Sequence, residues 1–459
     1  MPTYLSPGVY LEEVPPAARP IAGVSTSTAG FIGIVRDSIA YPERILLKEK
    51  GVTDKKEFDL NYPVDTDKAT FRATVDRKIV EDVLLDNDKG AKKSKVTFAK
   101  APDKDALIEV NYVWETDTFT PSVAVGEPKL VTNFTEFTKS FGSFSMDRDQ
   151  RLLAHAVYGF FDNGGSRCYV ARVTKKDDVE AALKSFATID EIAMVAIPGI
   201  TDEGQQEAVI KHCEKLEDRV AVLDGVEKPD PLDKEHIQNV RDSDKGYGAI
   251  YFPWIKVKDP IEGVRHLDGN GNAFVPPSGH VAGIYAQVDA TRGVHKAPAN
   301  VAIRGALDVK YRLTREQQDG LNPGGVNLLR VFGSKNVKVW GARTMGGDAN
   351  GEFKYISTRR YFNFLRESIE ESTQWVVFEP NSRALWQRII RSVSDFLLGQ
   401  WREGALFGDT PKQAFFVKCD EETNPPDVRE RGQVITLVGV AIVKPAEFVV
   451  FRLEQMTGG

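Results

Sequence analysis

The feature that most constrains the fold is an alternation of short apolar runs with amphipathic segments between residues 146 and 345. Residues 146–165 (MDRDQRLLAHAVYGFFDNGG) place their apolar side chains at helical spacing and end at two glycines. The run RCYVARV follows as a strand, and further helix and strand patterns alternate after it at 177–189, 191–199, 203–218, 219–225 and 247–255. Strands and helices that alternate with short turns predict a doubly wound, largely parallel α/β sheet.

This α/β domain is expected to cover residues 121–345. Ser278 precedes the apolar segment GHVAGIYAQVDATRG and is predicted to cap it as a helix. The strand-like run NVKVWGARTM at 336–345 is expected to close the domain.

A different pattern occupies residues 41–120, where short β-type runs lie between charged turns. In ALIEVNYVW (106–114), the apolar residues alternate with polar ones, which gives one buried and one exposed face. We therefore predict an inserted all-β sandwich that interrupts the chain after a first core strand within residues 21–40.

Two amphipathic helices followed by strands are typical of an α+β domain, which we place at residues 346–444. The apolar stripe of the first helix contains Tyr361, Phe362, Leu365 and Ile369. The stripe of the second helix contains Leu385, Trp386, Ile389, Ile390, Val393, Phe396, Leu397 and Trp401.

Both ends of the chain contain strand-forming runs that prolines separate from the rest. Residues 1–20 include Val9, Tyr10 and Leu11, and residues 445–459 include Val449, Val450 and Phe451. A strand donated to a neighbour's sheet edge forms main-chain hydrogen bonds that depend little on side-chain identity. Head-to-tail donation produces rings or helical polymers, so these arms predict an assembly protein.

Composition excludes several other classes. The net charge of −6 argues against nonspecific nucleic-acid binding, which needs a basic surface. Neither a signal peptide nor a transmembrane run is visible, so synthesis in a cytoplasm and no membrane insertion are expected. The three cysteines (168, 213, 419) are expected to be reduced and buried.

No motif in the sequence completes a catalytic or binding site, and we predict no catalytic, cofactor-binding or metal-binding residues. Asp268, Asn270 and Asn272 have calcium-loop spacing, but Ala273 and Gly279 stand where that loop needs Gly and Glu. No G-x-S-x-G elbow, phosphate loop or zinc-type histidine spacing occurs. Asp224 and His280 follow the order of an Asp…His…Ser hydrolase, yet no glycine-flanked serine begins a helix downstream.

Several long stretches resemble the contractile tail sheath proteins of phages and related injection systems. They are PTYLSPGVYLEEVPPAARPIAGVSTSTAGFIG at the start, PPSGHVAGIYAQVDATRGVHKAPAN, NLLRVFGSKNVKVWGARTM, YISTRRYFNFLRESIEESTQWVVFEPN, and the region from LWQRIIRSVSDFLLGQWREGALFG to the end. This resemblance implies a subtilisin-like α/β domain without protease chemistry. It also implies hexameric rings stacked around an inner tube, linked by donated arms, which contract from a metastable extended state.

The resemblance further implies baseplate and tail terminator or cap proteins as partners. It leaves open whether the chain comes from a phage tail or from a bacterial injection system. A surface adhesive and a hydrolase remain as alternative functions.

Tube binding is expected from basic residues on the two C-terminal helices, because the family uses a helix of its C-terminal domain for this contact. Exposed ion pairs are individually weak and suit a grip that must later break. The candidates are Arg359, Arg360 and Arg366 on the first helix, which we favour, and Arg388 and Arg391 on the second.

Overall fold

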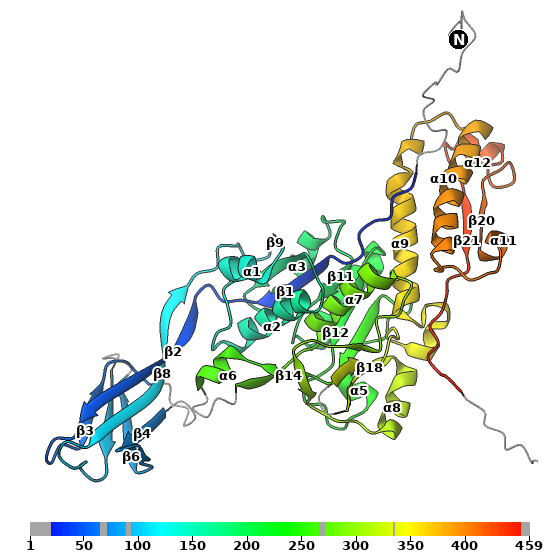
Figure 1. Ribbon diagram of the computed structural model, residues 1–459. Helices are drawn as coiled ribbons and strands as arrows, with labels where there is room; N and C mark the ends of the chain where they lie inside the picture. Colours follow the sequence, from blue (N-terminus) through cyan, green and yellow to red (C-terminus); the bar gives the residue numbers. More distant parts are fainter. Residues whose placement is uncertain (1–19, 65–70, 89–92, 266–270, 334–335, 451–459) are drawn as a thin grey trace, which may run out of the picture. The chain divides into compact units, whose positions relative to one another are not determined.

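The computed structural model describes residues 20–64, 71–88, 93–265, 271–333 and 336–450 (Figure 1). The chain forms two compact units, Ser25–Tyr361 and Met1–Val24 with Phe362–Gly459. The sequence suggested a boundary after residue 345, whereas the division falls inside helix α9 (Ile356–Ser372). Each unit is described by itself below.

The larger unit is organised around a 9-stranded sheet. The strands from β18 to β10 run parallel, and β9, β19 and β16 add antiparallel edges. In spatial order they are β16 (Val301–Ala302), β19 (Asn336–Val339), β18 (Val326–Phe332), β13 (Gly248–Phe252), β12 (Val220–Asp224), β11 (Met194–Ala196), β1 (Ala29–Ile34), β10 (Cys168–Val173) and β9 (Pro128–Val131).

Helices cover both faces of this sheet, as a doubly wound order requires. Helices α2 (Arg148–Asp162) and α7 (Ser278–Arg292) pack together on one face, and α3 (Val179–Phe186) and α4 (Glu203–Leu216) pack together on the other. Two glycines of strand β1 face these two helix layers. A side chain at Gly30 would meet Phe186 of α3, and one at Gly33 would meet Leu153 of α2. Glycine at these positions lets helices approach the sheet closely from opposite sides.

The remaining elements of this unit flank the sheet. A small antiparallel sheet pairs β14 (Ile255–Lys258) with β15 (Asn272–Val275) and β17 (Ala306–Val309). Shorter helices are α1 (Phe134–Phe141), α5 (Lys234–Ile237), α6 (Pro260–Arg265) and α8 (Arg315–Leu321). Most of the apolar stripe predicted for 146–165, including Leu153, Val157 and Phe160, is buried in the core.

Residues 39–119 form two antiparallel sheets with a hydrophobic core of their own (Figure 1, blue to cyan). Phe58 and Val96 from one sheet and Val110 and Tyr112 from the other lie in this core. The first sheet contains β2 (Ile39–Lys50), β8 (Leu107–Phe119), β4 (Phe71–Val75) and β5 (Lys78–Ile79), and the second contains β3 (Glu57–Leu60), β7 (Lys93–Phe98) and β6 (Val83–Asp88).

The smaller unit contains long helices and a two-stranded sheet. Helix α10 (Arg383–Arg402) buries Leu385, Trp386, Ile389, Val393 and Leu397, most of the stripe predicted for it. Strand β20 (Phe415–Lys418) pairs with β21 (Leu437–Val440) and packs against α10. Two short helices, α11 (Pro411–Ala414) and α12 (Pro426–Glu430), complete this unit.

Candidate functional site

The sheet of the smaller unit has unpaired edges in the part of the chain that the structure describes. Within the described residues, β20 and β21 have only each other as neighbours, so each has one edge without a paired strand. Phe416, Leu437 and Val438 on these strands are exposed. An unpaired strand edge of this kind is a template for pairing with a further strand.

The predicted C-terminal arm begins in the described residues. An isolated bridge pairs Ile442 with Leu406, and beyond it the chain up to Val450 is assigned to no strand. The side chains of Phe448, Val449 and Val450 are 71%, 69% and 77% exposed. The other arm residues singled out by sequence (Val9, Tyr10, Leu11 and Phe451) lie outside the described residues.

The prediction that Arg359 and Arg360 lie on an exposed helix face is wrong. Both side chains are buried, with 4% exposure each. Arg360 forms a bidentate ion pair with Asp289, with Nη–Oδ distances of 2.9 and 2.6 Å, and lies over the ring of Tyr285. Arg359 lies over the rings of Tyr247 and Phe353, at 4.5 and 3.8 Å. Fixed inside the larger unit, these two arginines have no exposed charge to offer a tube.

The other three basic candidates are more accessible. Arg366 on α9 and Arg391 on α10 are exposed. Arg388 is partly covered, because its guanidinium lies 4.4 Å from the ring of Trp375 and 3.5 Å from the carboxylate of Glu379. Arg366 and Arg391 are therefore the better candidates for an intermolecular ion pair.

Phe378 is an exposed residue that the sequence analysis missed. It lies in the connection between α9 and α10, is fully exposed, and has a φ of 64°, a conformation that an aromatic residue rarely adopts. The signal available in the sequence was the apolar run WVVF, which directly follows the polar end of the first helix.

The hydrolase candidates, Asp224 and His280, serve the packing of α7. Asp224 is buried at the end of β12, and its carboxylate accepts hydrogen bonds from the Ser278 backbone N–H (2.8 Å), the Ser278 Oγ (2.7 Å) and the Gly199 N–H (3.2 Å). Ser278 is thus not the N-cap predicted from sequence, because the N-cap is Pro277 and the side chain that accepts at this helix end belongs to Asp224.

Burial shifts the pKa of both groups. It raises the pKa of Asp224 to about 6, although the hydrogen bonds from Ser278 oppose this shift. Burial also lowers the pKa of His280 to about 3, with a further contribution from His155. His280 packs against Gly159 of α2. Because the Asp224 carboxyl and the His280 imidazole are both buried, neither group is accessible to an external substrate.

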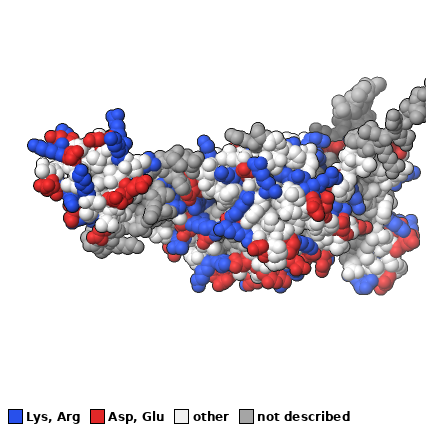
Figure 2. Space-filling model, turned by 90° about the horizontal axis from the view of Figure 1, so that it is seen from below, with Lys and Arg blue, Asp and Glu red and all other residues white. Residues whose placement is uncertain are grey.

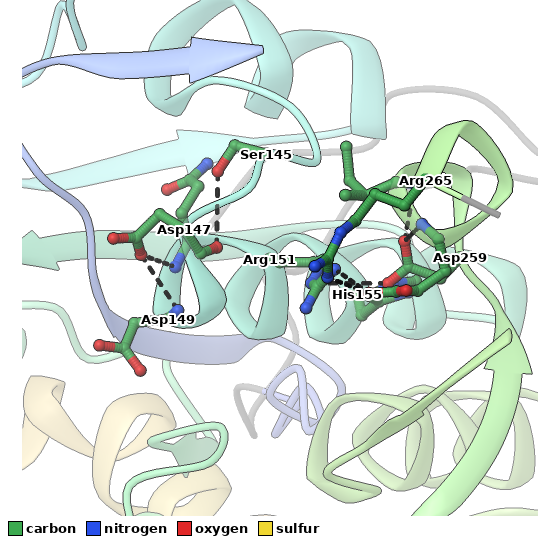
Figure 3. Close-up of polar contacts among 10 residues, drawn as sticks. Ser145, Asp147, Asp149, Arg151, His155, Asp259 and Arg265 are labelled. Carbon is green, nitrogen blue, oxygen red and sulfur yellow. Dashed lines mark hydrogen bonds and ion pairs between the residues drawn. The ribbon is translucent and has the colours of Figure 1, made fainter. Parts of the chain in front are cut away.

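A second buried pair joins α2 to α6 (Figure 3). His155 Nε2 lies 3.0 Å from Asp259 Oδ2, while Asp259 Oδ1 accepts from the backbone N–H groups of Ile261 and Glu262 at the start of α6. Burial would raise the pKa of Asp259, but the bond with His155 and the charge of Arg151 lower it below its ordinary value. Figure 3 shows Ser145 directed toward the Asp147 carbonyl and not toward this His–Asp pair.

Metal ligands and membrane-spanning helices are two further features that bear on function. Across the described ranges, no three His, Cys, Asp or Glu side chains come together as a metal ion would require, although Asp268 and Asn270 lie outside those ranges. The three cysteines are free and buried, as predicted. None of the helices described here is long and apolar enough to cross a bilayer. On the face seen in Figure 2, acidic and basic side chains are intermixed.

Comparison with known families identifies the chain. Residues 173–345 match the phage tail sheath protein central domain, and residues 348–456 match the phage tail sheath C-terminal domain. Together the two matches cover more than half of the chain. The chain belongs to the tail sheath protein family.

Curated relatives of this sheath chain are phage proteins. It is 27% identical over 183 residues to the tail sheath protein of Vibrio phage KVP40 and 23% identical over 191 residues to that of Enterobacteria phage T4. These matches cover 39% and 41% of this chain, but only 26% and 28% of the relatives. The sheath chain thus matches about a quarter of the length of these two phage proteins.

Solved sheath structures match over the full length. The helical sheath of the anti-feeding prophage in its contracted state is 25% identical to this chain, with a TM-score of 0.65. The match covers 99% of this chain and 100% of that one. The contracted sheath complex of an extracellular contractile injection system, PVC, has a TM-score of 0.66 at 24% identity, with 99% of both chains covered. The sheath chain therefore has the mixed α/β fold of these sheath subunits.

Proposed function

We propose that this chain is the structural subunit of a contractile sheath. It polymerises as stacked hexameric rings around an inner tube and contracts from a metastable extended state to drive that tube through a target envelope. The observation that carries this proposal is the full-length match to the helical sheath of the anti-feeding prophage, at 25% identity. Exposed arm residues and unpaired sheet edges support it independently.

In this proposal, donated strands link the subunits. The arms that contain Val9, Tyr10 and Leu11 and Val449, Val450 and Phe451 add strands to the β20–β21 sheet of neighbouring subunits. Such additions would cover Phe416, Leu437 and Val438 and satisfy the open backbone edges, the two features that an isolated two-stranded sheet leaves unsatisfied.

The tube contact is assigned to Arg366 and Arg391, which are exposed, with Arg388 in a secondary role because it is only partly exposed. Exposed ion pairs contribute about 0–1 kcal/mol each, so a ring of them holds firmly while each contact breaks easily. An inner tube protein with an acidic outer surface is the partner expected from this charge.

The subunit is proposed to act without catalysis or cofactors. Its α/β domain is proposed to be subtilisin-like in topology alone, since Asp224 and His280 are buried and used in packing. The work of contraction would come from the difference between subunit interfaces in the two states, as in other bistable packed assemblies. Baseplate and tail terminator or cap proteins would start and end the polymer.

A phage tail-like injection particle is favoured over a phage tail, with assembly in the bacterial cytoplasm. The solved injection-system sheaths match end to end, whereas the first two phage relatives are matched over about a quarter of their length. Genes for a capsid and a terminase beside this one would overturn this choice.

Polymerisation of purified subunits tests the proposed function. Deleting residues 1–18 or changing Val450 to Pro should leave soluble, folded subunits that form no tubes by electron microscopy, because each change removes strand pairing. Val125→Pro, at an exposed loop position of the larger unit, is a matched control that should still polymerise. Normal tubes from both arm variants would contradict strand donation.

A further inference from the structure

The chain passes between its two units only twice, at Val24–Ser25 and at Tyr361–Phe362. The first passage leads from the N-terminal arm toward β1, an interior strand of the α/β sheet, and the second lies within α9. The residues on either side of each passage are held by contacts within their own unit.

In the smaller unit, the segment before β1 is bonded to α9 by its backbone. The Ala22 N–H donates to Ser372 Oγ (3.2 Å), and the Val24 N–H donates to Ser368 Oγ (3.1 Å). Between them, Gly23 lies so close to the ring of Phe364 that a Cβ atom would be 2.9 Å from it. A side chain at residue 23 would therefore require a shift of the Phe364 ring or of the segment.

In the larger unit, the same segment is bonded to the buried arginine of α9. Arg360 Nη2 donates to the Thr26 carbonyl (3.0 Å), and Thr26 Oγ1 donates to Asp289 Oδ2 (2.8 Å). Asp289 in turn holds Arg360 through two ion-pair contacts. One carboxylate of α7 therefore secures both the incoming segment and α9.

The positions of these contacts on α9 are evenly spaced. On α9 they come from residues 360, 364, 368 and 372, four apart and thus along one side of the helix. On the segment they come from residues 22, 23, 24 and 26.

We propose that residues 22–26 are the anchor of the N-terminal arm. The arm pivots before Ala22, and a pull on it is carried by α9 and by Asp289 instead of peeling β1 out of the sheet. Ser368, Ser372, Arg360 and Asp289 act as positioning residues for this anchor. The mechanical role rests on the proposed function, but the anchor itself is a property of the single subunit.

Hydrogen exchange on the unassembled full-length subunit tests the anchor directly. The amides of Ala22 and Val24 should be protected, and the double variant S368A/S372A should accelerate their exchange about tenfold, the value expected for the loss of one hydrogen bond. S394A, a serine on α10 outside the contact row, should leave these amides unchanged. Wild-type exchange at the rate of an unstructured peptide would overturn the proposal, whether or not the protein forms sheaths.

A disulfide tests whether the anchor stays closed during contraction. The variant A22C/S372C replaces the outermost contact, and its oxidised and reduced forms should assemble and contract alike. Sheaths that contract only when reduced would show that the segment must leave α9, and the pivot would then lie elsewhere. If neither form assembles, the exchange measurement decides on the anchor, while failure of the wild-type protein to assemble counts against the proposed function alone.

Discussion

At the scale of single residues, the buried groups at the start of α7 respond to acid in opposite directions. His280 stays neutral in the folded subunit because burial lowers its pKa to about 3. In the unfolded chain His280 binds a proton near pH 6.5. It therefore lowers the free energy of unfolding as the pH falls from 6.5 toward 3. Asp224 has a raised pKa of about 6, so the folded state takes up its proton first. This group adds stability as the pH falls from about 6 to 4.

Urea unfolding between pH 6 and 4 should separate the two effects. In H280Q, the free energy of unfolding should fall with decreasing pH by about 1.4 kcal/mol per unit less than in the wild-type subunit. In D224N, the free energy of unfolding should fall with decreasing pH by about 1.4 kcal/mol per unit more than in the wild-type subunit. The reason is that the folded state no longer takes up the proton of Asp224. Comparing slopes removes the contribution of other groups, and slopes equal to that of the wild type in both variants would contradict this account.

At the scale of elements, apolar periodicity predicted some helices well and misled on α9. In α2 and α10 the buried positions are mostly apolar, so the period of the hydrophobic residues locates the buried face. Phe362, assigned to the apolar stripe of α9, is exposed. Helix α9 instead buries many polar side chains, among them Ser357, Thr358, Arg359, Arg360, Asn363 and Ser368.

The partners of these polar groups explain why one sequence could not reveal them. Arg360 pairs with Asp289, 71 positions away, and Ser368 accepts from Val24, 344 positions away. The spacing of residues along a helix says nothing about partners so distant in the sequence. The arginines of α9 were therefore predicted to lie on a solvent-exposed face, although they are buried. The open edges of β20 and β21 were only partly foreseeable for the same reason, because pairing is decided by the whole fold.

Charge reversal should now distinguish the exposed from the buried arginines. The variant R366E/R391E should fold normally and lose co-assembly with the tube at ordinary salt, because its exposed positive charges become negative. Wild-type sheath should also release its tube more readily as salt rises, since exposed pairs are screened. Pelleting of sheath with tube protein across a salt series measures both effects.

R360E serves as the contrasting variant in that experiment. It places two carboxylates together at a buried site, and removing one partner of a buried pair typically costs about 3–5 kcal/mol. Its thermal unfolding should therefore shift strongly, while that of R366E/R391E should not. If tube attachment changed neither in R366E/R391E nor with salt concentration, the contact would have to be apolar.

At the scale of the whole molecule, the all-β insert has its own hydrophobic core. Strands β2 and β8 pair from Ile39 and Phe119, which pack in the α/β core, to Lys50 and Leu107 near the other core. This ribbon is the covalent connection of the insert, and Arg44 on it also donates to the Val264 carbonyl at the end of α6. The sequence predicts an insert here because its strand period differs from the helical period that follows.

An independent core allows the insert to be removed without opening the rest. Arg44 and Val113 are paired in the ribbon, so residues 45–112 can be replaced by Asn-Gly, which favours a tight hairpin turn. Trp114 should be changed to Thr in this variant, because its stacking partner Tyr62 is removed. The shortened subunit should unfold in one transition close to that of the wild-type α/β core and should still form sheath visible by electron microscopy. We expect polymerisation to survive because we predict that the insert lies on the outside of the tube, away from the donated strands. A shortened subunit that folds but never polymerises would mean that the insert contributes to contacts between subunits.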